Sequence, residues 1–163
     1  MAGAIRITRG YAPGAIGRVV ELHGRYYGEA WGFGRQFEAQ VATELATFLQ
    51  GYDPARDGFW LAWRDETIIA SVSLDHKLSN GEDGARVRWF IASPEAQGTG
   101  VGHRLFDELV AFAPNAGRPN LYLWTFAGLT AARRIYDRAG FVLTDEAPDS
   151  SWGPMITAQR MQR

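Results

Sequence analysis

The segment Gln97–Gly102 (QGTGVG) has the residue types and the spacing of a turn that binds phosphate. It joins an apolar run, Val87–Ala92, to an amphipathic run, His103–Ala113, so it lies between a predicted strand and a predicted helix. Glycine allows positive φ values and close approach of a ligand, and the first amides of a helix lack partners within it. Because the helix dipole adds partial positive charge there, the turn predicts a phosphate site. The alternative is an ordinary strand-to-helix turn rich in glycine.

Two common phosphate loops do not fit this segment. A Walker loop requires a lysine after its last glycine, but His103 stands there and Lys77 is the only lysine in the sequence. A dinucleotide-binding turn requires an acidic residue about twenty positions further on. This chain has Asn120 in that region, so neither loop explains the glycines.

The spacing instead resembles the Gln/Arg-x-x-Gly-x-Gly/Ala signature of the GNAT superfamily of acetyl-CoA-dependent acyltransferases, with Gln97, Gly100 and Gly102 in its fixed positions. A second segment similar to that family follows at residues 132–141 (AxxxYxxxGF), and the resemblance is densest over residues 85–143. It implies the GNAT fold, an α+β fold whose mixed, mostly antiparallel sheet carries helices on both faces. It also implies acetyl-CoA as co-substrate.

For that co-substrate, the resemblance implies that amides of the turn hold the pyrophosphate of coenzyme A. It implies too that the strand end Phe90–Ala92 splays to pair with pantetheine. Leu129 stands where the family carries an asparagine that bonds the pantetheine arm, so Thr125 or Thr130 is left to supply a hydroxyl. The implied cofactor contacts come from the strand, the turn and the later elements: Phe90, Ile91, Ala92, Gln97, Gly98, Thr99, Gly100, Val101, Gly102, His103, Thr125, Ala132 and Tyr136.

Tyr136 is the candidate for the catalytic acid. Acetyl transfer needs a neutral amine as nucleophile, and only about one in two thousand lysine-like amines is neutral at pH 7. The departing thiolate must then be protonated or stabilised. Tyr136 shares a predicted helix face with Ala132, and its family position implies that the hydroxyl reaches the sulfur. The alternative is a core tyrosine that packs against the sheet.

The strand before the turn carries no carboxylate, although many relatives place a catalytic glutamate there. It has Arg86 and Arg88 instead, and strict alternation places both on one face together with Phe90. If that face lines the acceptor cleft, the arginines suit an acidic acceptor. Otherwise they belong to a solvated sheet edge.

The general base is therefore left open. The remaining candidates are ionisable residues elsewhere in the chain: His23, Glu29, Glu38, Asp75, Glu82 and Asp83. Direct attack through ordered water is a further alternative. His23 lies on the apolar face of a predicted helix, a position typical of a core histidine.

An aromatic cluster at residues 26–33 lies between the first two predicted helices, a region that borders the acceptor pocket in this fold. Tyr26 and Trp31 of this cluster are candidate substrate contacts, since aromatic rings can cage an amine through cation–π contacts. The alternative is that the cluster is plain core.

Periodicity and turn residues predict the elements that position these residues. Strands are expected over residues 4–9, 59–63, 67–74, 85–92, 120–126, 141–144 and 154–161, with a loop at 148–153. Helices are expected from Pro13 to a break at Gly28–Gly34, then over 37–48, 103–113 and 129–139. The order β-α-α-β-β-β-α-β-α-β-β is that of the GNAT fold.

Length and composition limit the number of domains, the kinds of partner and the kinds of metal site that the chain can have. At 163 residues the chain suits one domain, and we assign residues 1–163 to a single GNAT acetyltransferase domain. The 17 basic and 18 acidic residues nearly cancel, which argues against nucleic acid or an anionic membrane as partner. The absence of cysteine excludes disulfides and thiolate zinc sites, and with three histidines we expect no metal. No apolar run spans a membrane and residues 1–4 precede no signal core, so we expect a cytoplasmic protein.

The sequence thus predicts an acetyl-CoA-dependent N-acetyltransferase that moves an acetyl group to a primary amine of a small molecule or peptide by direct attack in a ternary complex. The alternatives are a non-catalytic acetyl-CoA-binding sensor or regulatory module, and a structural interaction domain. Tyr136 argues against the sensor, and Gln97–Gly102 argues against the interaction domain. A homodimer is left open.

A second, looser resemblance covers residues 23–26, 59–62, 123–125 and 129–136. These segments are similar to the acetyltransferase half of proteins that join a MarR-type winged helix to a GNAT domain. The sequence contains no winged helix, so the regulatory role of those proteins is not carried over.

Overall fold

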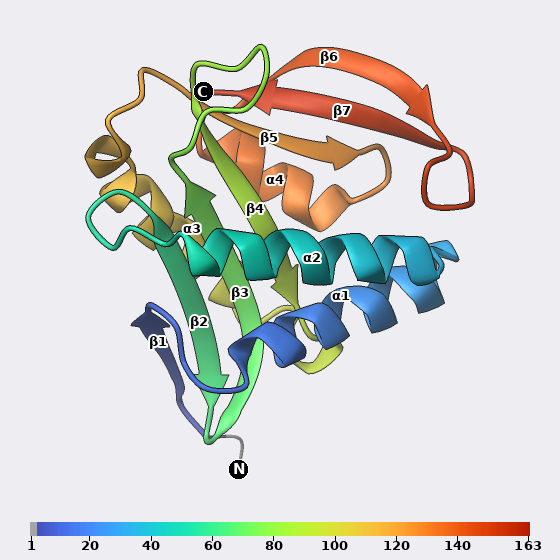
Figure 1. Ribbon diagram of the computed structural model, residues 1–163. Coiled ribbons are helices and arrows are strands. Elements are labelled where there is room, and N and C mark those ends of the chain that lie inside the picture. Colours follow the sequence, from blue (N-terminus) through green and yellow to red (C-terminus); the bar gives the residue numbers. More distant parts are fainter. Residues whose placement is uncertain (1–2) are drawn as a thin grey trace.

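The computed structural model describes residues 3–163, and its helices and strands follow the predicted order (Figure 1). Met1 and Ala2, part of segment 1–4 for which we expected no signal core, lie outside the described residues. The strands are β1 (Ile5–Arg9), β2 (Gly58–Arg64), β3 (Thr67–Asp75), β4 (Ala85–Ala92), β5 (Leu121–Phe126), β6 (Val142–Asp149) and β7 (Ile156–Gln162). The helices are α1 (Ala15–Trp31), α2 (Arg35–Gln50), α3 (Val101–Phe112) and α4 (Thr130–Arg138), with short 3₁₀ helices at Pro94–Ala96 and Ala113–Ala116. No helix within residues 3–163 has the length and the apolar composition that crossing a membrane requires.

The strands form one seven-stranded sheet in the order β1-β2-β3-β4-β5-β7-β6. Among the described strands, β4 and β5 are the only parallel neighbours, and they pair only at Ala85 with Leu121 and at Arg86 with Tyr122. Beyond these pairs the two strands diverge, and α4 lies beside the opening (Figure 1). The sheet therefore leaves backbone groups of β4 without strand partners along this gap.

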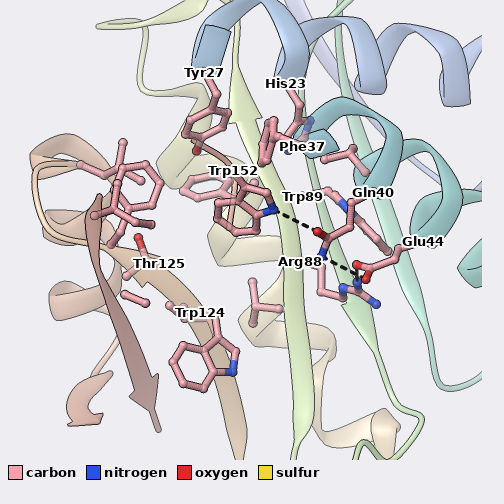
Figure 2. Close-up of a pocket in the computed structure, with 18 of the residues that line it drawn as sticks. His23, Tyr27, Phe37, Gln40, Glu44, Arg88, Trp89, Trp124, Thr125 and Trp152 are labelled. Carbon is pink, nitrogen blue, oxygen red and sulfur yellow. Dashed lines mark hydrogen bonds and ion pairs between the residues drawn. The ribbon is translucent and has the colours of Figure 1, made fainter. Parts of the chain in front are cut away.

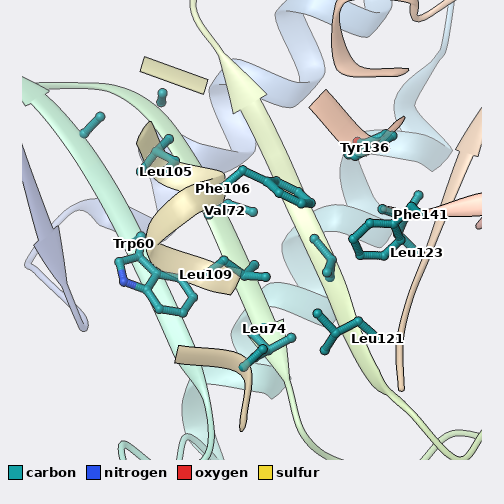
Figure 3. Close-up of a cluster of buried hydrophobic side chains, with 14 of the residues drawn as sticks. Trp60, Val72, Leu74, Leu105, Phe106, Leu109, Leu121, Leu123, Tyr136 and Phe141 are labelled. Atoms are coloured by element: carbon teal, nitrogen blue, oxygen red, sulfur yellow. The ribbon is translucent and has the colours of Figure 1, made fainter. Parts of the chain in front are cut away.

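Helices cover both faces of the sheet, and each face has its own core. On one face, Phe106 of α3 and Tyr136 of α4 belong to a cluster of buried side chains (Figure 3). On the other face, Val19 of α1 and Leu45 of α2 are fully buried against the strands. Burial of one such apolar side chain contributes about 1.5–3 kcal/mol. The predicted α+β arrangement, with a mixed sheet between two helix layers, is confirmed.

A β-bulge in β4 changes which residues share a face. The pairing register shifts between Ser71 and Ser73 of β3, so Trp89 and Phe90 together lie opposite one β3 residue. Trp89 has a φ of 50°, a left-handed value that a non-glycine residue rarely adopts. As a result Trp89 packs in the α1/α2 core, whereas Phe90 packs against the α3/α4 core. The predicted common face of Phe90 and the two arginines is therefore wrong for Phe90.

The predicted ends of α1 and β6 are also wrong. Helix α1 passes through Gly28 and ends at Trp31, and the next residue, Gly32, has a φ of 71°, the left-handed value of a helix cap. Strand β6 continues to Asp149 instead of ending at Thr144. It lies at the edge of the sheet, where Pro148 costs no ladder hydrogen bond on its open side.

Candidate active site

The glycine turn has the geometry of an anion-binding cradle. Gly98 and Gly100 have φ values of 80° and 81°, and a Cβ on either would contact nothing within 4 Å. Helix α3 begins at Val101 rather than at His103 as predicted. The amides of Val101, Gly102 and His103 thus fall in its first turn, where the helix itself provides no acceptor. The turn is open and positively polarised, as a pyrophosphate requires.

Gly102 has a different role from the other two glycines of the turn. A Cβ on Gly102 would lie 3.1 Å from Ile135 Cδ1 and 3.3 Å from Phe90 Cζ, so glycine lets α3 pack closely against α4 and β4. At the same helix end, Arg138 Nη1 donates a hydrogen bond to His103 Nδ1 at 3.0 Å. This contact holds a guanidinium beside the first turn of α3, and sequence reasoning missed Arg138.

A cavity of about 400 Å³ lies between the α1/α2 layer and the sheet, where β4 and β5 diverge (Figure 2). Its lining comes from α1, α2, β4, β5, α4 and the two strands β6 and β7. The lining includes six residues predicted for the site or as a base: His23, Arg86, Arg88, Phe90, Thr125 and Tyr136. The fold therefore gathers residues from distant parts of the sequence around one space.

Tyr136 lines this cavity from α4, while its ring packs in the α3/α4 core. The ring centroid lies 5.6 Å from that of Phe106 and 6.0 Å from that of Phe90. Burial raises the pKa of the Tyr136 phenol, so the phenol stays protonated at neutral pH. Burial, and then the nearby Tyr136, also raise the pKa of Tyr27 on the same cavity wall. Tyr136 is thus both a core side chain and a protonated donor, and its catalytic role stays a prediction.

His23 is buried in α1, and its Nδ1 lies 2.8 Å from the carbonyl oxygen of Val19. A carbonyl only accepts hydrogen bonds, so Nδ1 carries the proton and Nε2 is the unprotonated nitrogen. Burial lowers the pKa of His23 from 6.5 to about 4, against the smaller opposing effect of the Val19 bond. At pH 7 the cavity wall therefore includes a neutral imidazole.

The other predicted bases lie outside the cavity lining: Glu29, Glu38, Asp75, Glu82 and Asp83. Three of them have hydrogen-bond partners of their own, and one is Asp83, which accepts from Asn120 Nδ2 at 3.1 Å. Glu82 accepts two hydrogen bonds from Arg160, at 2.6 and 2.9 Å, and Asp75 accepts from the Lys77 amide at 3.0 Å. Of the predicted bases, only His23 is positioned by the fold at the cavity.

Arg88 is held by several neighbours within the sheet. It pairs with Glu44 of α2, its Nη1 lies 3.6 Å from Asp75 Oδ2, and its guanidinium stacks over the Trp89 ring at 4.1 Å. Burial, and then the charge of Arg86, lower the pKa of Arg88. Because β4 is an interior strand between β3 and β5, the alternative of a solvated sheet edge is wrong for both arginines.

The structure does not bring Tyr26 and Trp31 into the cavity lining. Tyr26 packs edge-on against Tyr27 at 4.9 Å, and Trp31 packs edge-on against Phe126 at 4.8 Å. Of these four rings, Tyr27 and Phe126 line the cavity. Tyr26 and Trp31 thus pack behind the side chains that line the cavity, and their contact with a substrate stays a prediction.

The lining residues that sequence reasoning missed include Trp124, Asp149 and Trp152. Trp124 of β5 remains 47% exposed. Trp152 donates its Nε1–H to Gln40 Oε1 at 2.9 Å, which links the β6–β7 loop to α2 (Figure 2). Hydrogen bonds from Ser151 lower the pKa of the Asp149 carboxyl, so Asp149 stays ionised. Alternation along β5 could have identified Trp124, but no local pattern marks the other two.

The implied cofactor contacts border the same gap. Phe90 and Thr125 line the cavity from β4 and β5. Ala132 of α4 packs against the α3/α4 core, and Gln97 and Thr99 are exposed on the turn. These positions are compatible with an extended ligand that runs from the turn into the gap.

One group of potential metal ligands, Asp57, Asp75 and His76, lies outside the cavity, with ligand atoms within 4.8 Å of one another. The Asp57 carboxylate already accepts from His76 Nδ1 at 2.6 Å, from the His76 amide at 2.9 Å and from the Asp53 amide at 2.8 Å. These bonds give the buried carboxylate a structural role. The expectation that the chain needs no metal stays a prediction.

The family assignment can be tested by comparison with known proteins. The model of the acetyltransferase (GNAT) family matches residues 16–141. This chain belongs to that family. The predictions of GNAT membership and of its fold are therefore confirmed.

Two curated relatives match part of this GNAT chain. A mycothiol acetyltransferase from Cellulomonas flavigena is 36% identical over 110 residues, which is 63% of this chain and 30% of that protein. A mycothiol acetyltransferase from Geodermatophilus obscurus is 32% identical over 104 residues, which is 62% of this chain and 32% of that protein. The chain thus spans about a third of the length of the curated relatives it matches. None of these matches bears on the looser resemblance to MarR–GNAT proteins.

Solved structures share the fold over nearly the whole GNAT chain. An acetyltransferase of the GNAT family from Staphylococcus aureus gives a TM-score of 0.75 over 98% of both chains, at 17% identity. A protein from Salmonella typhimurium assigned as an acetyltransferase, whose structure contains its cofactor acetyl-CoA, gives 0.71 at 17% identity and covers 97% of this chain and 93% of that one. At these identities the likeness shows the fold alone.

Proposed function

We propose that residues 1–163 act as a single acetyl-CoA-dependent N-acetyltransferase domain that acetylates a primary amine of a small molecule. The observation that carries the proposal is the position of Tyr136. This protonated phenol lines the cavity at the gap between β4 and β5, on the helix that packs against the glycine turn at Gly102. A peptide amine is the alternative acceptor.

The chain's own groups fit coenzyme A. Gly98 and Gly100 leave the turn open, and the first amides of α3 are free to bind a pyrophosphate. Arg138, held by His103, adds positive charge at that end. Beyond Arg86, the unpaired backbone of β4 offers hydrogen bonds to an extended pantetheine arm. The acetyl-CoA named for the Salmonella typhimurium neighbour supports the same co-substrate.

The reaction requires one bond to form, one to break and two protons to move. Bound acetyl-CoA supplies the thioester, whose carbonyl carbon bonds to the amine nitrogen as the carbon–sulfur bond breaks. Amides of β4 beyond Arg86, which have no pairing partner in β5, polarise the carbonyl oxygen in this proposal. Tyr136 supplies a proton or a hydrogen bond to the sulfur, and the amine proton leaves to water or to His23 Nε2. With a pKa of about 4, His23 orients the amine or relays its proton rather than storing it.

The acceptor class rests on the cavity and on the relatives. A cavity of about 400 Å³ suits a small molecule. The mycothiol acetyltransferases act, by name, on a small-molecule acceptor, which supports the same class here. The matched segments cover only 30% and 32% of those proteins, so the amine that they acetylate is one member of the panel rather than the expected substrate.

The test is release of coenzyme A thiol from acetyl-CoA in the presence of a panel of small primary amines and short peptides. An acetyltransferase releases thiol only when a suitable amine is present, and the amine gains an acetyl group by mass. A sensor or regulatory module would bind coenzyme A by calorimetry and release no thiol with any amine. Absence of both binding and release would contradict the proposal as a whole.

A further inference from the structure

We propose that the acceptor carries an anionic group, a carboxylate or a phosphate, remote from its amine, and that Arg86 binds this group. The inference rests on the proposed function, because it assigns the substrate class of the same cavity. It depends on a difference between the two arginines of β4 that their sequence spacing does not reveal.

Arg88 has little capacity left for a ligand. Its guanidinium pairs with Glu44, lies 3.6 Å from Asp75 and stacks on Trp89 at 4.1 Å. These contacts compensate its charge within the protein. A ligand acid would have to compete with two carboxylates that the fold already holds in place.

Arg86 lines the same cavity without such compensation. Within residues 3–163, none of the ion pairs includes Arg86, and its Nε is buried with no hydrogen-bond acceptor. Asp75 pairs with Arg86 in the β3–β4 register, but one Asp75 oxygen accepts from the Lys77 amide and the other faces Arg88. A buried donor without an acceptor is costly, and an oxyanion in the cavity would supply one.

The charges of the cavity are separated along its length. Arg86 pairs with Tyr122 at the start of β5. Phe90, whose ring lies next to that of Tyr136, is four residues further along β4, so roughly 13 Å of strand separates it from Arg86. Asp149 lies at the Tyr136 end, because the pairing register places it beyond the level of Phe126, the last residue of β5. The cavity therefore has an uncompensated cation at one end and an ionised carboxylate at the end where the amine must react.

Trp124 adds an apolar surface between the two ends of the cavity. It lies two residues after Tyr122 on the same face of β5, lines the cavity, and is 47% exposed. A ring or chain that links the amine to the acid can pack on this indole. An amine and an acid on the same carbon are too close together to reach both ends. The expected acceptors are dipeptides, longer ω-amino acids or aminoalkyl phosphates.

The experiment measures kcat/KM for acids and their neutral counterparts. The pairs are glycyl-phenylalanine and its C-terminal amide, 6-aminohexyl phosphate and 6-aminohexanol, and phenylalanine and its amide. The wild-type protein should prefer the remote acid over its neutral partner about tenfold or more, the size of one hydrogen bond between charged groups. The phenylalanine pair should show a smaller preference, and comparison of the first two pairs distinguishes carboxylate from phosphate.

Variants assign this preference to one arginine. Arg86→Met keeps the apolar stem and removes the charge, so the acid-to-neutral ratio should fall to near one. Arg86→Lys restores the charge and should recover part of the ratio. Arg88→Met, the matched change on the same strand, should retain the preference.

Each failure has a distinct meaning. Equal rates for acids and neutral amines in the wild-type protein, or an acid preference that survives in Arg86→Met, would overturn the inference and leave the acetyltransferase function standing. Loss of preference in Arg88→Met but not in Arg86→Met would assign it to the other arginine. An equal preference in the phenylalanine pair would contradict the remote placement. If Arg86→Met does not fold, the acid-to-neutral ratios of kcat/KM in the wild-type protein and in Arg86→Lys test the inference instead. If none of the amines is acetylated, that result would instead contradict the proposed function.

Discussion

The glycine turn and the acceptor cavity, the two halves of the candidate site, are built in different ways. The turn consists of consecutive residues, 97–103, and its chemistry is that of backbone amides and glycine φ values. The cavity is lined by side chains from seven helices and strands, and its chemistry depends on which of them already have partners. A contiguous backbone site can be recognised by spacing alone. A site assembled from side chains requires the fold, because partners such as Glu44 and Arg88 are far apart in the chain.

The largest effect is expected in the turn. Gly100→Asp should abolish measurable binding of coenzyme A, since a carboxylate would face the pyrophosphate at a position with φ of 81°. Gly117→Asp is the matched control, because Gly117 has a φ of 69° and equally open surroundings, and it follows the 3₁₀ helix Ala113–Ala116 beyond the C-terminal end of α3. Calorimetric titration with coenzyme A measures both. Unchanged affinity in a folded Gly100→Asp variant would rule out the turn as the cradle.

The second largest effect is expected at Tyr136, where the glycine turn and the acceptor cavity meet. Tyr136→Phe should lower kcat by about a hundred to ten thousandfold, the usual range for general-acid help. A phenol pKa near 10 already exceeds a free thiol's pKa near 8.5, so full proton transfer is uphill by about 2 kcal/mol. Burial raises the Tyr136 pKa further, so the hydroxyl must donate its proton while charge develops on sulfur, or act mainly by hydrogen bonding.

The readout for this variant is steady-state kinetics beside a binding titration. Coenzyme A affinity should change by less than about 1 kcal/mol, the size of one net hydrogen bond. Tyr27→Phe, the other phenol on the cavity wall, should lower kcat much less. If kcat of Tyr136→Phe holds within about threefold while chemistry is rate-limiting, Tyr136 is a core tyrosine alone.

On the cavity side, His23 should make stability depend on pH. Its pKa is lowered to about 4 in the folded protein, so between pH 6.5 and pH 4 the unfolded chain binds the proton and the folded protein does not. Stability is fully present above pH 6.5 and should fall by about 3 kcal/mol as pH drops to 4. Urea unfolding of wild type and His23→Gln measures this, and the variant should have a flatter profile. Equal slopes for the two proteins would show that His23 is not a buried neutral imidazole.

The smallest effect separates the two arginines by stability. Arg88→Met leaves Glu44 and Asp75 without their partner, so the free energy of unfolding should fall by about 1–3 kcal/mol. Arg86→Met removes no ion pair and should cost less. Urea unfolding of both variants gives the comparison. A larger loss for Arg86→Met would contradict the view that Arg88, and not Arg86, is compensated within the protein.

Much of the fold could be predicted from the sequence because it follows from local signals. Apolar periodicity gave the element order, and Gln97–Gly102 with Ala132 and Tyr136 gave the family. The end of β6 could not be predicted because Pro148 is tolerated only when the strand lies at the edge, which is a property of the whole sheet.

The cavity was predicted only in part, and the reason is again non-local. Strand alternation predicted Arg86 and Arg88, and Thr125 was named only as a substitute for the asparagine that Leu129 replaces. The bulge at Trp89, however, moves Phe90 to the other face. The bulge is set by pairing with β3, which no pattern within β4 reveals. Trp152 and Asp149 reach the cavity only because the β6–β7 hairpin docks on α2, so their part in the lining depends on tertiary contacts.

The central claim is that an amine in the cavity attacks acetyl-CoA directly, with both substrates bound. The most direct test is to mix the protein with acetyl-CoA and the best amine of the panel, and to quantify released thiol, acetylated amine and acetylated protein by mass spectrometry. We expect equal amounts of thiol and acetylated amine, no thiol release without the amine, and no acetyl group on the protein. Thiol release without amine, or an acetylated protein that later transfers its acetyl group, would contradict it.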